Sequence, residues 1–131
     1  MIGGEWKTCL IDIDRSSEFT GDDVDQYSKL VNLGRIYDKI MIIVPTIDSS
    51  ALNLYAQRND SSATVPTIVH HGYMYDASGA GNVWTTAAWS TTAGTGAYAI
   101  ECNCVCAQYI RIRATTNQTA DRTLYVMGVR G

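Results

Sequence analysis

The stretch that decides the fold is Asp38-Lys-Ile-Met-Ile-Ile-Val-Pro-Thr-Ile47, in which five apolar, mostly β-branched residues run from Ile40 to Val44. β-Branched side chains lose rotamer freedom in a helix, and a helix needs at least about ten residues. Pro45 follows the run and has no N–H to donate to a neighbouring strand. The stretch therefore predicts a central strand that is buried on both faces and ends at Pro45.

Short segments with strand character recur along the rest of the chain, separated by turns rich in Gly, Ser, Asn and Asp. In 51–58 and 108–115 apolar and polar residues alternate, which is typical of half-buried strands. Further strands are predicted at 8–14, 28–33, 65–72, 82–90, 97–106 and 122–129. We expect an all-β fold, an antiparallel two-sheet sandwich that is jelly-roll-like, with about eight strands and little or no helix. The alternative left open is a short helix capped by Asp22.

The chain has 131 residues and a formal net charge of −3. This length fits one domain, residues 1–131, with 1–6 as an N-terminal arm. Nucleic-acid binding needs clustered Lys and Arg, so we expect no nucleic-acid partner. No apolar run reaches the eighteen or so residues of a membrane span, and no secretory signal opens the chain. We therefore expect synthesis in a cytoplasm and no membrane partner.

Four cysteines are present, and three of them alternate as Cys102-Asn-Cys104-Val-Cys106. Alternating strand residues share a face at a spacing of roughly 6.5–7 Å, which is too wide for adjacent ligands of one zinc ion. The triplet is therefore interpreted as core thiols. Two acidic clusters raise calcium as a hypothesis, but they lack the spacing of an EF-hand loop, so no metal or cofactor is predicted. Their members are Asp12, Asp14, Asp22, Asp23 and Asp25.

The sequence contains no arrangement of residues that is typical of a catalytic site. His70 and His71 are the two histidines, and neighbours in a strand point to opposite faces. No Ser or Cys partner and no spaced pair of carboxylates accompanies them. We therefore predict no catalytic residues and no enzymatic activity.

Tyrosine and tryptophan are the residues most suited to contacts with a partner. Eight Tyr and three Trp stand against one Phe, and aromatic rings with a polar group favour half-wet positions. The stretch 73–96 carries four of these rings, which either stack on a partner or fill the end of the core. In 108–115 one tyrosine and two arginines are predicted to face outward. The candidate contact residues are Tyr73, Tyr75, Trp84, Trp89, Tyr109, Arg111 and Arg113.

Several segments together resemble small structural proteins of tailed bacteriophages. These are Leu33–Lys39 leading into 40–45, the polar strand 51–58, the region of Trp84, 108–113 and 122–131. The chain looks like the jelly-roll head-decoration, or cement, proteins. That resemblance implies a virion structural protein that binds the outside of a phage head and stabilises it. It also implies the major capsid protein or another virion protein as partner, and a homo-oligomer such as a dimer or trimer.

A second hypothesis comes from the aromatic residues alone. Tyr73, Tyr75, Trp84 and Trp89 would form the stacking platform of a carbohydrate-binding β-sandwich module.

Overall fold

The computed structural model describes residues 2–11, 28–57, 67–69, 72–76, 83–85, 89–91, 94–103, 105–116 and 118–130. Within these ranges twelve strands form two antiparallel sheets and no helix occurs, so the predicted all-β sandwich is confirmed. Eight of the twelve strands have five residues or more, in agreement with the predicted number of about eight, and the other four have only two or three. Nothing in this part of the chain is a helix long and apolar enough to cross a bilayer.

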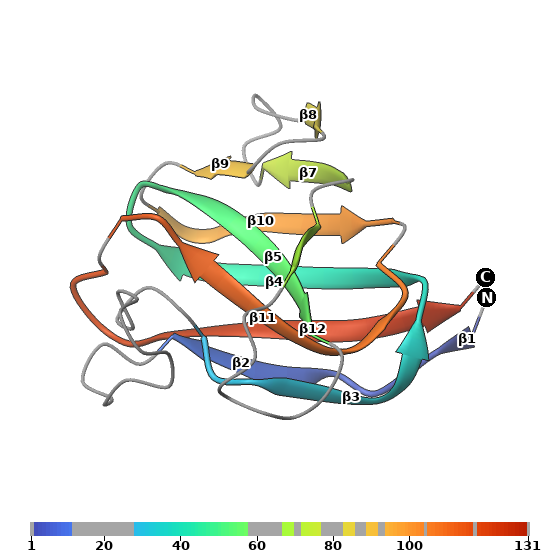
Figure 1. Ribbon diagram of the computed structural model, residues 1–131. Coiled ribbons are helices and arrows are strands. Elements are labelled where there is room, and N and C mark those ends of the chain that lie inside the picture. Colours follow the sequence, from blue (N-terminus) through green and yellow to red (C-terminus); the bar gives the residue numbers. More distant parts are fainter. Residues whose placement is uncertain are drawn as a thin grey trace.

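The two sheets pack face to face, and the strands of one cross the strands of the other at an angle (Figure 1). The seven-stranded sheet has the order β1 (Ile2–Gly3), β12 (Arg122–Arg130), β4 (Lys39–Ile47), β10 (Gly94–Cys102), β7 (Gly72–Asp76), β8 (Val83–Thr85), and β2 (Lys7–Ile11) also pairs with β12. The five-stranded sheet has the order β3 (Val31–Tyr37), β11 (Ala107–Ala114), β5 (Ser50–Gln57), β6 (Thr67–Val69), and β9 (Trp89–Thr91) also pairs with β5.

Strand β4 is central in the seven-stranded sheet, as its sequence predicts, with β12 on one side and β10 on the other. Ile40, Ile42 and Val44 point inward and are at most 1% exposed. The prediction of burial on both faces is wrong for the outer face, where Met41 and Ile43 are only half-buried. The strand also continues past Pro45, because Thr46 and Ile47 still pair with β10.

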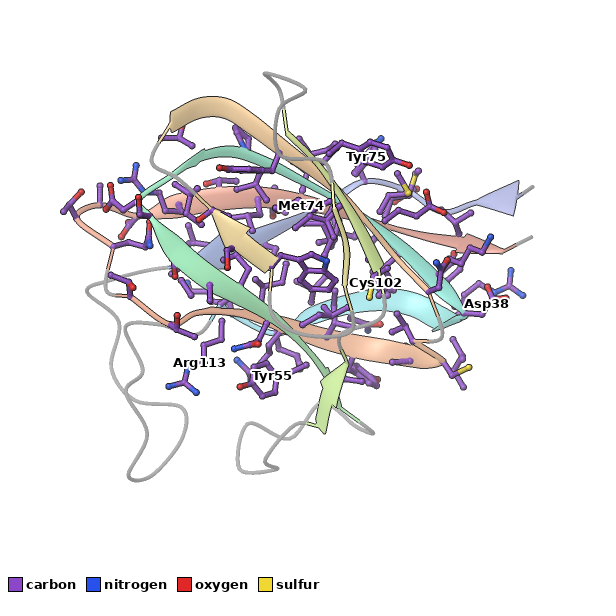
Figure 2. All side chains as sticks on the ribbon, turned by 90° about the horizontal axis from the view of Figure 1, so that it is seen from above. Asp38, Tyr55, Met74, Tyr75, Cys102 and Arg113 are labelled. Atoms are coloured by element: carbon purple, nitrogen blue, oxygen red, sulfur yellow. The ribbon has the colours of Figure 1, made fainter. Side chains whose placement is uncertain are left out.

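The core lies between the sheets and is filled by aliphatic side chains from both. Leu54, Ile110 and Ile112 of the five-stranded sheet are at most 2% exposed. Figure 2 shows Met74 and Cys102 between the sheets, with Tyr75 on the far side from Tyr55 and Arg113. The two sheets therefore have separate outer faces that look in opposite directions.

Strand β3 extends to Tyr37 and does not end at Gly34 as predicted. Gly34 has φ of +89°, a conformation that glycine adopts at no steric cost. The register between β11 and β3 shifts in this region, so Gly34 lies at an irregular position in a strand that continues beyond it. The helix considered at Asp22 lies outside the described residues, as do the acidic clusters of 12–25.

Candidate docking face and polar network

The outer face of the seven-stranded sheet carries a row of apolar side chains that crosses four strands. Tyr125 of β12 pairs with Ile43 of β4, Ile43 pairs with Ala99 of β10, and Ala99 pairs with Tyr75 of β7. Tyr125 is 40% and Tyr75 is 42% exposed, and the two residues between them are half-buried. Paired residues of an antiparallel ladder lie on the same face, so the row forms one continuous apolar surface.

A second row of side chains lies two residues further along the strands, on the same face, and includes charged residues. Met127 pairs with Met41, and Met41 pairs with Glu101. All three are half-buried, and Lys39 lies two residues from Met41 on β4. We call the surface made by Tyr125, Ile43, Ala99, Tyr75, Met127, Met41, Glu101 and Lys39 the outer apolar face.

The size of this face decides what it can bind. With strands about 4.8 Å apart and about 3.3 Å per residue, it covers roughly 300–400 Å². Apolar patches of about this size on single chains are often functional. Stable interfaces bury about 800 Å² per partner, so one such contact would be weak by itself. The geometry suits a contact that is repeated many times.

A polar network stands at one end of this face, where the turn after β4 meets the segment before β12. The Arg122 guanidinium lies 3.2 Å from the Asp48 carboxylate, which also accepts hydrogen bonds from the Thr119 backbone N–H (2.8 Å) and hydroxyl (2.9 Å). Gln118 Oε1 accepts from the Asp48 N–H (2.8 Å) and from Arg122 Nε (3.3 Å). The bonds from Thr119, and then Arg122, hold the pKa of Asp48 below its ordinary value. Because the groups bind one another, the network fixes the segment that enters β12.

Tyr75 and Trp89 are the two residues of the predicted aromatic platform whose side chains the structure describes, and they do not share a surface. Tyr75 lies on the outer apolar face, as expected for a contact residue. Tyr73 and Trp84 lie opposite each other in the β7–β8 ladder, but their side chains are outside the described part of the structure. Trp89 is 1% exposed, so the prediction that it contacts a partner is wrong and the alternative of core filling is right. Its indole packs against Gly72, where an added Cβ would lie 2.9 Å from the ring.

The three candidates on β11 belong to the other sheet. Tyr109 and Arg113 are half-buried, and Arg113 lies on the side opposite Tyr75 (Figure 2). Arg111 has the predicted parity, yet its prediction as a surface residue is wrong because it is 0% exposed. Its guanidinium donates a 3.0 Å hydrogen bond to the Ser28 carbonyl. Alternation gives the side of a strand on which a residue lies, but not whether that side is covered.

Ser28, whose carbonyl accepts the hydrogen bond from Arg111, also joins the two sheets. The Ser28 N–H donates to the Ile112 carbonyl (2.7 Å), and the Ile112 N–H donates to the Ser28 hydroxyl (2.9 Å). Ser28 also forms a bridge with Ile11 of β2. One residue thus joins β11 of the five-stranded sheet to β2 of the seven-stranded sheet and closes this edge of the sandwich.

The cysteine triplet is divided between core and surface. Cys102 is 0% exposed, as predicted, but Cys106 is exposed. The prediction fails for Cys106 because β10 ends at Cys102 and the chain crosses to β11, with Cys106 at φ of +49°. Val105 takes the buried position, and its N–H donates to the Asp38 carbonyl (2.9 Å). Cys104 lies outside the described residues.

This division predicts the pattern of thiol labelling. At pH 8 iodoacetamide is expected to modify Cys106 in minutes and to leave Cys9 and Cys102 unmodified until the protein unfolds, since the thiolate is the nucleophile. Burial raises the pKa of Cys9 to about 11, so its labelling should stay slow through pH 10. Peptide mapping by mass spectrometry gives the rates, and labelling in urea is the control. Equal rates for Cys9 and Cys106 in the folded protein would contradict the structure.

The described residues include neither histidine. His70 and His71 lie outside the described residues. Among the residues that are described, no group of three or more His, Cys, Asp or Glu side chains is placed to hold a metal ion.

Sequence reasoning missed the residues at the centre of the outer apolar face, namely Met41, Ile43, Tyr125 and Met127. A signal for them was present. An unbroken apolar run in an antiparallel sheet makes both faces of the strand apolar, and here the outer face stays partly exposed. The alternation in 122–129 likewise places Tyr125 and Met127 opposite the buried Leu124 and Val126.

The comparisons with known proteins find similarity at the level of structure alone, and that similarity is distant. No protein-family model matches the chain, and no match occurs among the curated proteins compared. Among solved structures, the chain is similar to the crystal structure of SPBc2 prophage-derived protein YomS, with a TM-score of 0.45 and 10% sequence identity. The match covers 95% of this chain and 94% of that chain.

Proposed function

We propose that this protein is a structural component of a bacteriophage virion that binds the outside of the head and stabilises it. The observation that carries the proposal is the outer apolar face, with its exposed Tyr75 and Tyr125. Aromatic residues and Met are enriched in protein interfaces, where they supply large contact areas. The sequence resemblance to head-decoration proteins gives the same role.

The small area of the outer apolar face favours a capsid lattice, with its repeated sites, as the partner. A contact of roughly 300–400 Å² per copy, estimated from strand spacings, is too small for a stable complex between two isolated proteins. A capsid presents the same site many times, and a small homo-oligomer that engages several sites gains avidity without any new contact. The proposed partner is therefore the major capsid protein, bound by a dimer or trimer of this chain. The proposed location is the virion, after synthesis in the host cytoplasm.

The proposal predicts that polar substitutions on the outer apolar face weaken binding to heads. In co-sedimentation with empty expanded heads, Ile43→Asp and Tyr75→Ser are expected to lower the bound fraction at least about tenfold, since a desolvated charge or a lost aromatic anchor costs 2 kcal/mol or more. Ile36→Asp is the matched control, because Ile36 is 66% exposed but lies on β3 of the other sheet.

Circular dichroism would show that each variant keeps its fold, and sedimentation velocity would report the oligomer. Loss of binding in Ile36→Asp but not in Ile43→Asp would place the contact on the other sheet. A wild-type protein that stays monomeric and does not bind heads would refute the proposal.

A further inference from the structure

A pocket opens where β4 and β12 separate. Their ladder reaches Ile43 and Tyr125 and goes no further. Beyond that pair β4 remains paired with β10 as far as Ile47, and β12 remains paired with β2 as far as Arg122. Two residues after Ile43 lies Pro45, which has no N–H to donate to a neighbouring strand. The sheet therefore splits at Pro45, and each strand keeps its other neighbour.

The opening has the size of a small-molecule site. Its volume is about 320 Å³, at the lower end of the range of about 300–1,000 Å³ for such sites. It lies beside the outer apolar face, with Tyr125 at the boundary between the two. The residues that line it are Pro45, Thr46, Asp121, Arg122, Thr123 and Tyr125.

The lining combines an aromatic ring with groups that donate and groups that accept hydrogen bonds. The Tyr125 ring is 40% exposed and offers a flat apolar surface with a hydroxyl at its tip. The two threonine hydroxyls both donate and accept, the Asp121 carboxylate accepts, and the Arg122 guanidinium donates. A pyranose has the matching surface, because its C–H face is apolar and hydroxyl groups surround it. Asp48 already pairs with the Arg122 guanidinium, so the Asp121 carboxylate gives this region a net negative charge, which disfavours an anionic ligand.

The Arg122 side chain in the pocket wall is held in place before any ligand arrives. Arg122 is held by Asp48 at 3.2 Å and by Gln118 at 3.3 Å, and Asp48 also accepts two hydrogen bonds from Thr119. Arg122 is therefore positioned by a network that does not depend on the ligand. A site ordered in advance loses less entropy on binding.

From this arrangement we propose that the pocket between β4 and β12 binds a neutral hexose residue, stacked on Tyr125 and hydrogen-bonded by Asp121, Arg122 and the two threonines. The inference does not depend on the proposed docking to heads. It also differs from a platform built on Trp84 and Trp89, since the pocket uses neither residue.

The test is titration of ¹⁵N-labelled protein with methyl α-D-glucoside, methyl α-D-galactoside and N-acetyl-D-glucosamine, followed by amide chemical shifts. At least one sugar is expected to shift the amides of Thr46, Asp121 and Thr123, with a Kd in the millimolar range, about 1 mM being typical of one weak small-ligand contact. Tyr125→Ala and Asp121→Asn are each expected to weaken binding about tenfold or more. Tyr75→Ala is the matched control, because it removes an exposed tyrosine from the same sheet but not from the pocket.

The outcomes distinguish sugar binding in this pocket from head binding by the outer apolar face. Asp121→Asn should lower sugar binding and leave co-sedimentation with heads unchanged, whereas Tyr75→Ala should do the reverse. If none of the sugars shifts these amides, or if the shifts persist in Tyr125→Ala, the proposal is wrong. Tighter binding of inorganic phosphate than of every sugar would also overturn it, because the pocket would then be an anion site.

Discussion

Replacement of Trp89 by alanine is expected to lower the free energy of unfolding by about 3–5 kcal/mol, the usual cost of removing a large buried aromatic side chain. Trp89 is 1% exposed and lies in the gap between the sheets, with Ile42 and Ile100 on one side and Leu52 and Ile112 on the other. Close-packed interiors relax only partly around a missing group, so most of the cavity would remain.

The measurement is equilibrium unfolding in urea followed by circular dichroism. Trp6→Ala is the control, because Trp6 is 48% exposed and its removal should change stability by no more than about 0.5 kcal/mol. A loss below about 1 kcal/mol for Trp89→Ala would mean that the indole does not fill the core.

Gly128→Ala is expected to destabilise the protein by about 1–3 kcal/mol, the range for overpacking a filled interior. Tyr37 is 7% exposed, and its ring lies directly on the Gly128 backbone, so an added methyl group would collide with it. The Gly128 carbonyl also accepts a 2.8 Å hydrogen bond from the Gly4 N–H, which limits how far this part of β12 can move. The ring must move instead.

A double-mutant cycle identifies the cause. In a Tyr37→Ala background the collision is absent, so the additional effect of Gly128→Ala should fall by about 0.5–3 kcal/mol, the usual coupling between residues in contact. Urea unfolding of the four proteins gives the coupling energy. If the two substitutions are additive, the destabilisation comes from the strand backbone and not from Tyr37.

The fold class could be predicted from the sequence because it depends on local signals. The β-branched run 40–44 identified the central strand, and the alternation in 51–58 and 108–115 identified the two longest strands of the other sheet. These patterns express side-chain periodicity, which survives in the folded protein. The same run did not show that the outer face of β4, with Met41 and Ile43, is only half-buried.

The sites were harder to predict because they depend on which segments cover which faces. Trp89 lies on a three-residue strand, and nothing local shows that Gly72 leaves room for its ring. Arg111 has the alternation of a surface residue but is 0% exposed, and it donates a hydrogen bond to Ser28, which lies 83 residues away in the chain. The pocket requires two strands to part, and only the donor missing at Pro45 hints at this in the sequence.

The placement of β4 between β10 and β12 has a consequence for biosynthesis. Both neighbours come much later in the chain, since Ile43 pairs with Ala99 and with Tyr125. Pairings between such distant segments form slowly, because a long loop must close before they stabilise anything. As the ribosome makes the protein, the most apolar strand must wait with both edges open, which is the state most prone to aggregation. Chaperone protection during translation would matter most between the emergence of β4 and the arrival of β12.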